Sequence, residues 1–396
     1  MPGRSGFSEQ RNFFRKIYCK NFCQKHKYNY NFWLFFKEFV RFMAENQNHK
    51  FKAIDFFCGG GGMTCGLRQA GIDVIAGVDF DKNARETYEF NNPGSVFVYS
   101  DITELSLDYF ETNFGVQKND DRLIMVGCSP CQYYSIINTD HSKAEKSKDL
   151  LMNFYKFIEH YMPGYILVEN VPGILTNKET VLPKFLEHIE NLGYNHKEEV
   201  VDMSQYGVPQ SRHRFSLIAT RLKGVNVSLP KKAEKVLTVA DVLGEKNGFP
   251  KIKAGFQDNT DFQHSVAGLN EVSLQRMALT PHNGGNRLSW ADRPELQLNC
   301  YIGKNDSFKD NYGRMWWDKP SPTITTKFLS ISNGRFAHPE EDRAISIREG
   351  ATLQSFPKDY VFKTNSMAGA ARIIGNAVPC EYARRLGCWI TNGEKF

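Results

Sequence analysis

An α/β fold with a parallel sheet covered by helices on both faces is predicted by two features of the 396-residue chain. From Phe51 onward, short apolar runs alternate with stretches of helical pattern. The runs at 51–57, 73–80, 122–127 and 164–170 are predominantly apolar, as in strands buried on both faces. Helical patterns at 63–71, 82–91 and 148–162 stand between them, and this spacing is typical of βαβ units.

The remaining elements follow in chain order. "FKAIDFF" (51–57) ends in a glycine cluster, the first helix closes at Gly71, and a third strand is expected to end before "SDI" (100–102). "FSLIATR" (215–221) is a further strand. From about 222 the periodicity weakens, which predicts a smaller, loop-rich domain to about 320, and helical patterns return at 346–354 and 367–391.

The composition argues against a membrane-spanning helix and against a disulfide framework. No apolar run reaches the about 18 residues that span a bilayer. The nine cysteines are odd in number and irregularly spaced, which indicates reduced thiols in a cytoplasm.

The net charge of +6 comes from the first 42 residues, which hold nine basic and two acidic residues. From Met43 onward there are 41 basic and 42 acidic residues. A basic, aromatic tail can bind nucleic acid. We favour the interpretation that residues 1–42 are upstream sequence translated from an early start. The codons of Phe, Tyr, Asn and Lys are AT-rich, and Met43 resembles a natural start.

"DFFCGGGG" lies between the first strand and a helix, where glycines allow a tight turn and close approach of a ligand. The strict dinucleotide fingerprint fails, because Thr64 or Cys65 occupies its third glycine position, and the lysine of a phosphate loop is missing. Asp55 at this edge is expected to repel a phosphate. A cationic nucleoside such as S-adenosylmethionine fits better.

Two further strand ends carry acids. In "VDFD" Asp79 can accept hydrogen bonds from ribose hydroxyls, and Phe80 can stack on adenine. Asp101 follows the third strand. Three acids at successive strand ends predict a nucleoside site.

"GCSPCQYYS" (127–135) places Cys128 and Cys131 in a C-x-x-C pattern. Such a pair can be a redox couple, half of a zinc site, or one nucleophile beside a bystander. The spacing alone leaves these alternatives open.

Five motifs in order make the chain resemble the DNA (cytosine-5) methyltransferases of bacterial restriction–modification systems. They are Pro130-Cys131-Gln132, Glu169-Asn170-Val171, the set Gln210, Arg212 and Arg214, "SIREGATLQSFP", and "GNAVP". The resemblance covers about 51–221 and 320–380. It implies a Rossmann-like S-adenosylmethionine-dependent methyltransferase fold with a smaller, loop-rich target-recognition domain. The implied divisions are an N-terminal extension (1–50), a catalytic and cofactor domain (51–221), the recognition domain (222–320) and a returning C-terminal segment (321–396).

The resemblance also implies catalytic roles. Cys131 is the nucleophile that adds to carbon 6 of cytosine, and Cys128 is a bystander. Glu169 binds ring nitrogen 3 and the amino group, which requires a protonated carboxyl. Arg214 contacts the exocyclic oxygen, and Arg212 braces the loop.

Implied contacts to S-adenosylmethionine fall on eight residues, with no metal: Phe57, Gly59, Gly61, Asp79, Phe80, Asp101, Ile102 and Asn376. Several positions depart from the family pattern. Asp79 stands where glutamate is usual, Thr352 where arginine is usual, and Tyr134 where phenylalanine is usual. Tyr133, like Tyr134, is larger than the residues common there.

The implied partner is double-stranded DNA with a flipped target base, in a monomeric cytoplasmic enzyme paired with a restriction endonuclease. Residues 222–320 hold 14 basic and 11 acidic residues, so their charges must be clustered to bind DNA. Candidate base readers are Arg276, Arg287, Arg293, Arg314, His282, Asn283 and Asn286. The alternatives are a tRNA-methylating relative and a catalytically inactive DNA-binding module.

Overall fold

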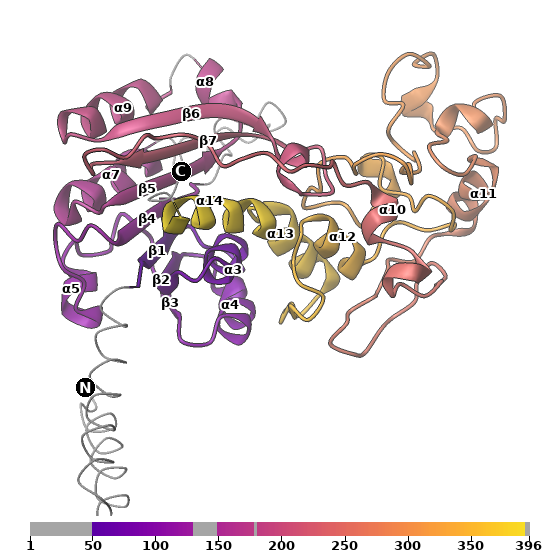
Figure 1. Cartoon of the computed structure of the whole chain (residues 1–396). Coiled ribbons are helices and arrows are strands. Elements are labelled where there is room, and N and C mark those ends of the chain that lie inside the picture. Colours follow the sequence, from indigo (N-terminus) through magenta and orange to yellow (C-terminus); the bar gives the residue numbers. More distant parts are fainter. Residues whose placement is uncertain (1–49, 130–148, 178–179, 393–396) are drawn as a thin grey trace, which may run out of the picture. The chain divides into compact units, whose positions relative to one another are not determined.

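The computed structural model describes residues 50–129, 149–177 and 180–392. Contacts divide the chain into two units, 1–50 and 51–396. Everything below concerns the second unit, whose ribbon is shown in Figure 1.

A seven-stranded sheet forms the centre of this unit, in the order β3-β2-β1-β4-β5-β7-β6. Its strands are β1 (Lys52–Phe56), β2 (Asp73–Asp79), β3 (Val96–Tyr99), β4 (Leu123–Gly127), β5 (Tyr165–Asn170), β6 (Asn195–Asp202) and β7 (His213–Thr220). The first five pair in parallel, as predicted. β7 runs antiparallel to both β5 and β6, so the sheet is mixed.

Strand β6 was not predicted from the sequence. Its residues "NHKEEVVD" are mostly polar because the strand lies at the edge of the sheet and much of it is exposed. Charged side chains on an edge strand discourage pairing with other chains. Apolar runs in a sequence reveal buried strands only. The polar, largely exposed strand β6 was therefore missed.

The predicted helices are present with small shifts: α3 (Gly62–Gln69), η1 (Lys82–Ala84) with α4 (Arg85–Asn91), α7 (Leu150–Tyr161), α12 (Ile347–Leu353), α13 (Met367–Asn376) and α14 (Cys380–Asn392). Three further helices were not predicted: α5 (Tyr109–Phe114), α8 (Gly173–Thr176) and α9 (Leu182–Asn191). The single pattern at 367–391 is thus two helices. Helix α13 ends where Ala377 becomes extended, and Pro379 disfavours helical geometry at Val378, the residue before it.

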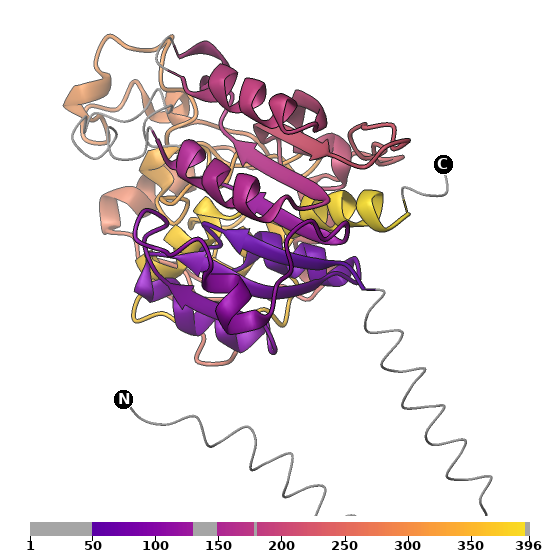
Figure 2. The same ribbon diagram turned by 90° about the vertical axis from the view of Figure 1, so that its left-hand side faces the viewer.

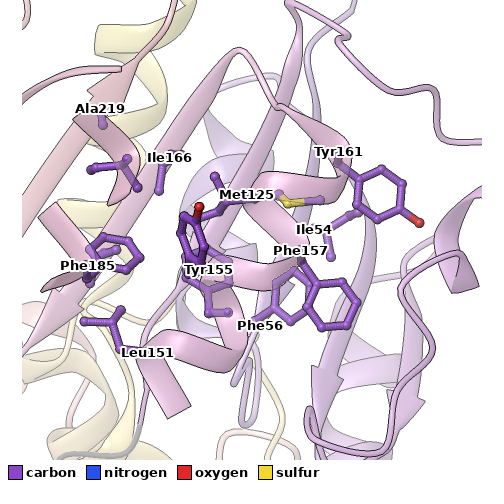
Figure 3. Packing of buried hydrophobic residues seen from close by; sticks show 14 of the residues in the cluster. Ile54, Phe56, Met125, Leu151, Tyr155, Phe157, Tyr161, Ile166, Phe185 and Ala219 are labelled. Atoms are coloured by element: carbon purple, nitrogen blue, oxygen red, sulfur yellow. The ribbon is translucent and has the colours of Figure 1, made fainter. Parts of the chain in front are cut away.

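The sheet is packed on both faces. Ile54 and Phe56 of β1 join a cluster with α7 and α9, in which Phe56 meets Phe154 and Phe157 at ring-centroid distances of 5.3 and 5.0 Å (Figure 3). Ala53 faces the opposite cluster, which includes residues of α3 and α14. Figures 1 and 2 show the sheet between these helices. Alternate residues of each strand therefore enter different cores, which explains the continuous apolar runs.

Residues 222–320 contain only short elements, which are α10 (Val239–Val242), η3 (Glu245–Asn247), α11 (Glu271–Leu279), η4 (Arg287–Trp290) and η5 (Asn299–Tyr301). A further short helix, η2 (Met203–Tyr206), lies between β6 and β7. Met277, Trp290 and Tyr312 form a local core, completed by side chains from 331–344, where η6 (Ile331–Asn333) lies. Within the described part of the chain, no helix is both long and apolar enough to cross a membrane.

Candidate active site and cofactor site

The turn between β1 and α3 holds three residues with positive φ: Phe57 (62°), Gly59 (50°) and Gly61 (89°). A Cβ added to Gly60 would lie 2.3 Å from Cγ2 of Ile373, and one added to Gly61 would lie 2.6 Å from Nδ2 of Asn92. A Cβ added to Gly59 would meet no atom within 4 Å. Gly60 and Gly61 thus allow close packing, whereas Gly59 faces open space that a ligand can fill.

Asp79, at the end of β2, holds this turn in place. Its Oδ2 accepts a hydrogen bond from the Gly59 N–H at 2.8 Å, and its Oδ1 accepts one from the Asp81 N–H at 2.8 Å. Burial raises the pKa of Asp79. The carboxylate therefore supports the glycine turn directly, and each of its oxygens keeps a further lone pair for a ligand.

Large aromatic side chains are exposed at the same edge. Phe80 is 60% exposed and Tyr99 is 58% exposed, and Tyr99 pairs in register with Asp79 across β3 and β2. The sequence reading missed Tyr99, although its place directly before "SDI" was a usable signal. Two exposed rings at adjacent strand ends can stack on a planar ligand.

The other predicted cofactor residues differ in accessibility. Asp101 is exposed and accepts hydrogen bonds from the backbone N–H and the hydroxyl of Thr103. Asn376 is exposed at the end of α13. Ile102 is 5% exposed and packs in the core beside α7.

Asp55 is fully buried beneath the glycine turn and accepts a hydrogen bond from Oγ1 of Thr64 at 2.7 Å. Its Oδ1 has no hydrogen-bond partner in the described part of the chain. Burial raises the pKa of Asp55 from 3.8 to about 7. The expectation that a negative Asp55 repels phosphate is therefore weakened, because near neutral pH the group is only partly ionised.

Pro130, Cys131 and Gln132 lie outside the described residues. The residue before them, Ser129, is buried and held by Asn170 at the end of β5. Nδ2 of Asn170 donates to the Ser129 carbonyl oxygen at 3.3 Å and to its Oγ at 3.1 Å. Oδ1 of Asn170 accepts from the N–H of Val171. Asn170 thus fixes the chain where the Pro-Cys-Gln motif begins.

Glu169 and Arg214 meet beside this point. Nε of Arg214 lies 3.2 Å from Oε1 of Glu169, and their side chains are 16% and 11% exposed. The contact lacks hydrogen-bond geometry, and Oε1 of Glu169 has no hydrogen-bond partner among the described residues. A mostly buried carboxyl with an oxygen that accepts no hydrogen bond can bind a polar ligand.

Cys128 has the environment of an unreactive thiol. Burial raises its pKa well above the usual value, and the nearby Glu169 and Asp55 raise it further. Because the thiolate is the reactive form, these conditions disfavour Cys128 as a nucleophile or redox partner. This agrees with a bystander role.

Arg212 is buried and connects distant parts of the chain. Nη1 donates to the carbonyl of Ile324 at 3.2 Å, and Nη2 donates to those of Gly375 and Ala377 at 3.3 and 3.4 Å. Gln210 joins this set, since its Oε1 accepts from the Ile324 N–H at 2.7 Å. Both side chains tie the residues just before β7 to Ile324, and Arg212 alone also reaches the end of α13.

A family model for C-5 cytosine-specific DNA methylases matches residues 51–392. The chain belongs to this family.

The methylase is similar to curated relatives across most of its length. It is 38% identical to the type II methylase M.HgiDII of Herpetosiphon aurantiacus, over 84% of this chain and 92% of that protein. It is 31% identical to the type II methyltransferase M1.HphI of Haemophilus parahaemolyticus, over 82% of each chain. The chain is accordingly a DNA (cytosine-5-)-methyltransferase of the type II restriction–modification kind.

Solved structures support the fold. The methylase matches a prophage-encoded protein (E. coli) assigned as a DNA modification methyltransferase, with a TM-score of 0.68 and 22% identity, over 88% of this chain and all of that one. It matches Dnmt2 of S. pombe with a TM-score of 0.58 and 18% identity, over the same shares.

Three of the candidate base readers of the methylase are buried, and this corrects the sequence prediction. Arg276, Arg287 and Arg314 are 6%, 1% and 0% exposed. Nε of Arg276 donates to the carbonyl of Leu296, and Arg314 donates to four carbonyls between Met277 and Glu341. Loop-rich segments have few internal backbone partners, so these cations satisfy the carbonyls instead.

The other candidate base readers differ in exposure and in their hydrogen bonds. Arg293 and His282 are exposed. Asn283 and Asn286 use their side-chain oxygens on the chain itself, accepting from the N–H groups of Trp317 and Leu288.

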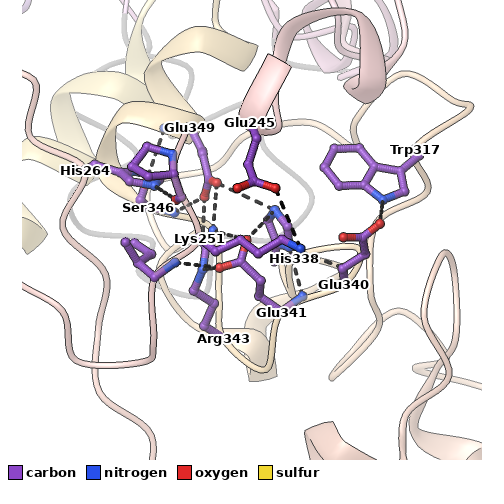
Figure 4. Close-up of polar contacts among 12 residues, drawn as sticks. Glu245, Lys251, His264, Trp317, His338, Glu340, Glu341, Arg343, Ser346 and Glu349 are labelled. Carbon is purple, nitrogen blue, oxygen red and sulfur yellow. Dashed lines mark hydrogen bonds and ion pairs between the residues drawn. The ribbon is translucent and has the colours of Figure 1, made fainter. Parts of the chain in front are cut away.

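A buried polar cluster next to this region also escaped the sequence reading (Figure 4). Arg343 forms a two-pronged pair with Glu349, with N–O distances of 2.7 and 2.9 Å. Burial alone would raise the pKa of Glu349, but Arg343 outweighs it and lowers the pKa to about 2. His264 contacts Ser346, whose hydroxyl caps α12. The described residues contain no group of three His, Cys, Asp or Glu arranged to hold a metal ion.

Proposed function

We propose that the chain methylates carbon 5 of one cytosine within a specific double-stranded DNA sequence, through a covalent adduct between Cys131 and a flipped base. The observation that supports this most is the pair Glu169–Arg214 beside the buried Ser129, two residues before Cys131. The nucleophile and the two groups that bind the base are expected to converge at that point.

The chemistry requires such a set of groups. Carbon 5 of cytosine is a poor nucleophile until a thiolate adds to carbon 6, which gives an enamine-like ring. Cys131 forms the sulfur–carbon bond. Glu169 hydrogen-bonds nitrogen 3 and the amino group, and Arg214 binds the exocyclic oxygen, so that both stabilise charge on the ring. Carbon 5 then accepts the methyl group, loses its proton, and the sulfur–carbon bond breaks.

S-adenosylmethionine, when bound, supplies the methyl group from its sulfonium. The residues at the edge of β1, β2 and β3 fit this molecule. Gly59 leaves open space above the turn, and the exposed ring of Phe80 provides a stacking surface for adenine. Asp79 retains lone pairs for the ribose hydroxyls. Asp101 and Asn376, which also belong to the predicted cofactor set, are both exposed.

We further propose that residues 222–320 recognise the DNA sequence, because a flipped cytosine looks the same whatever its neighbours. Flanking bases must be read at groove edges by side chains outside the catalytic pocket. We also propose that the enzyme is a monomer that protects host DNA from a paired restriction endonuclease, because the relatives are type II methylases.

The test is expression in a bacterial host that lacks cytosine-5 methylation, followed by genome-wide mapping of 5-methylcytosine. The expected result is near-complete methylation of one cytosine in one short recurring sequence, and none with Cys131→Ala. Purified protein given duplex DNA and tRNA should methylate the DNA. Methylation confined to tRNA, or an unmethylated genome, contradicts the proposal.

A further inference from the structure

Four large hydrophobic side chains in the described part of the chain stand out by exposure, and they fall in two places. Phe80 and Tyr99, 60% and 58% exposed, lie at the cofactor edge. Ile302 and Phe308, 64% and 57% exposed, lie six residues apart in one loop of the segment 222–320. A ligand accounts for the first place. At the second place the ring of Phe308 contacts Tyr301, with ring centroids 6.2 Å apart, yet more than half of its surface stays exposed in the described part of the chain.

The loop 302–309, here called the reading loop, is held in shape by Arg287. Nε of this arginine donates to the Phe308 carbonyl at 3.2 Å, and Nη2 donates to the carbonyls of Ser307, at 2.7 Å, and Lys304. The guanidinium carbon lies 4.6 Å from the ring centroid of the largely buried Tyr301. Three carbonyls of one loop thus point toward one buried cation.

The consequence is an outward display of side chains. All eight residues of the reading loop are exposed. Phe308 adopts a φ of 54°, a left-handed conformation that is unfavourable for an aromatic residue. Such strain persists where the surrounding contacts impose it, and it concentrates at functional sites. The structure therefore fixes a strained loop whose apolar groups face solvent.

We propose that the reading loop enters a groove of the DNA, where Ile302 and Phe308 contact base edges and determine the methylated sequence. This rests on the proposed function. Apolar side chains distinguish bases through contacts such as that with the thymine methyl group. The loop also holds Lys304 and Lys309, and these outnumber its one acid, Asp306, whose Oδ1 lies 4.0 Å from Nζ of Lys309. The remaining positive charge suits a phosphate backbone.

The burial of three arginines strengthens this assignment. Arg276, Arg287 and Arg314 cannot reach a base without breaking their carbonyl contacts. Sequence reading must then use other side chains, and Arg287 contributes as a positioning residue for the loop. A duplex is favoured over a second copy of the chain because the loop carries a positive excess.

The test compares the double variant Ile302→Ser/Phe308→Ser with the matched control Val272→Ser/Phe256→Ser. The control residues lie in the same segment and are 38% and 45% exposed. The reading-loop variant should lose about tenfold or more in kcat/KM for the mapped DNA site. Its affinity for S-adenosylmethionine and its melting temperature should match the wild type. Methylation mapping should show relaxed discrimination at one or two base pairs.

Several outcomes separate the two proposals. A wild-type protein that methylates no DNA defeats the proposed function itself. An active wild type whose reading-loop variant equals the control in kcat/KM and in methylation pattern overturns the inference. Loss of cofactor affinity in the variant also overturns it, because the side chains would then support the fold. So does a wild-type dimer that the variant converts to monomers with unchanged DNA kinetics.

Discussion

Nε of Arg214 lies 3.2 Å from Oε1 of Glu169, and the antiparallel pairing of β7 with β5 brings them together. Glu169 stands directly opposite Ser216, and Arg214 is two residues from Ser216, so all three side chains leave the same face of the sheet. The hydroxyl of Tyr382 in α14 donates to Oγ of Ser216 at 2.7 Å, which connects this face of the sheet to α14. Two motifs 45 positions apart thus form one site at the strand ends.

Glu169→Gln should lower the rate of methyl transfer by about 100-fold or more, because the amide cannot supply the proton for nitrogen 3. Affinity for S-adenosylmethionine should be unchanged. The matched control is Glu199→Gln on the edge strand β6, which β7 separates from β5 and where the side chain is exposed. Single-turnover kinetics measure the effect, and equal rates for both variants speak against the assigned role.

Phe80→Ala should weaken binding of S-adenosylmethionine by about 1 kcal/mol or more, because an exposed stacking surface is lost. Phe90→Ala removes a ring of similar exposure, 53%, from α4, away from the strand ends. Calorimetric titration of both variants distinguishes a binding site from a general loss of surface. Equal affinities would place adenine elsewhere.

Arg314→Ala should lower the free energy of unfolding by about 3 kcal/mol or more, because several buried carbonyls lose their donor. The exposed Arg293→Ala should change it by less than about 0.5 kcal/mol. Denaturant unfolding measures both. A stable Arg314→Ala protein with altered DNA specificity would restore Arg314 as a base reader.

Acid should unfold the protein partly through Glu349. Its pKa is about 2 when folded, below its usual 4.5, so its stabilising contribution is complete above about pH 4.5 and is lost as the pH falls toward 2. The linked loss is about 3 kcal/mol. Glu349→Gln should be less stable at pH 6 and should show a shallower decline between pH 4.5 and 2. An unchanged decline would show that other groups govern acid unfolding.

Much of the fold could be predicted because buried strands leave an apolar pattern. β1, β2, β4 and β5 were all visible in this way. β6 was not, since its edge position favours charged residues, and the antiparallel direction of β7 leaves no local trace. The mixed sheet nevertheless decides where Arg214 lies.

The sequence predicted only some of the functional residues, again because burial depends on contacts between distant parts of the chain. Motifs identified Glu169 and Arg214, but the buried state of Arg276, Arg287 and Arg314 depends on carbonyls that are distant in the chain. Arginine in a loop-rich segment looks like a DNA contact in the sequence, whereas here it replaces missing backbone hydrogen bonds. The exposure of Ile302 and Phe308 was equally invisible, because apolar residues usually indicate a core.

The role of Cys131 as nucleophile is tested most directly by duplex DNA with 5-fluorocytosine at the mapped target. Fluorine replaces the proton that must leave carbon 5, so after methyl transfer the bond between sulfur and carbon 6 cannot break. The wild type should form a complex that survives denaturing electrophoresis and depends on S-adenosylmethionine, and Cys131→Ser should form none. Full trapping by the Cys131→Ser protein would contradict the account.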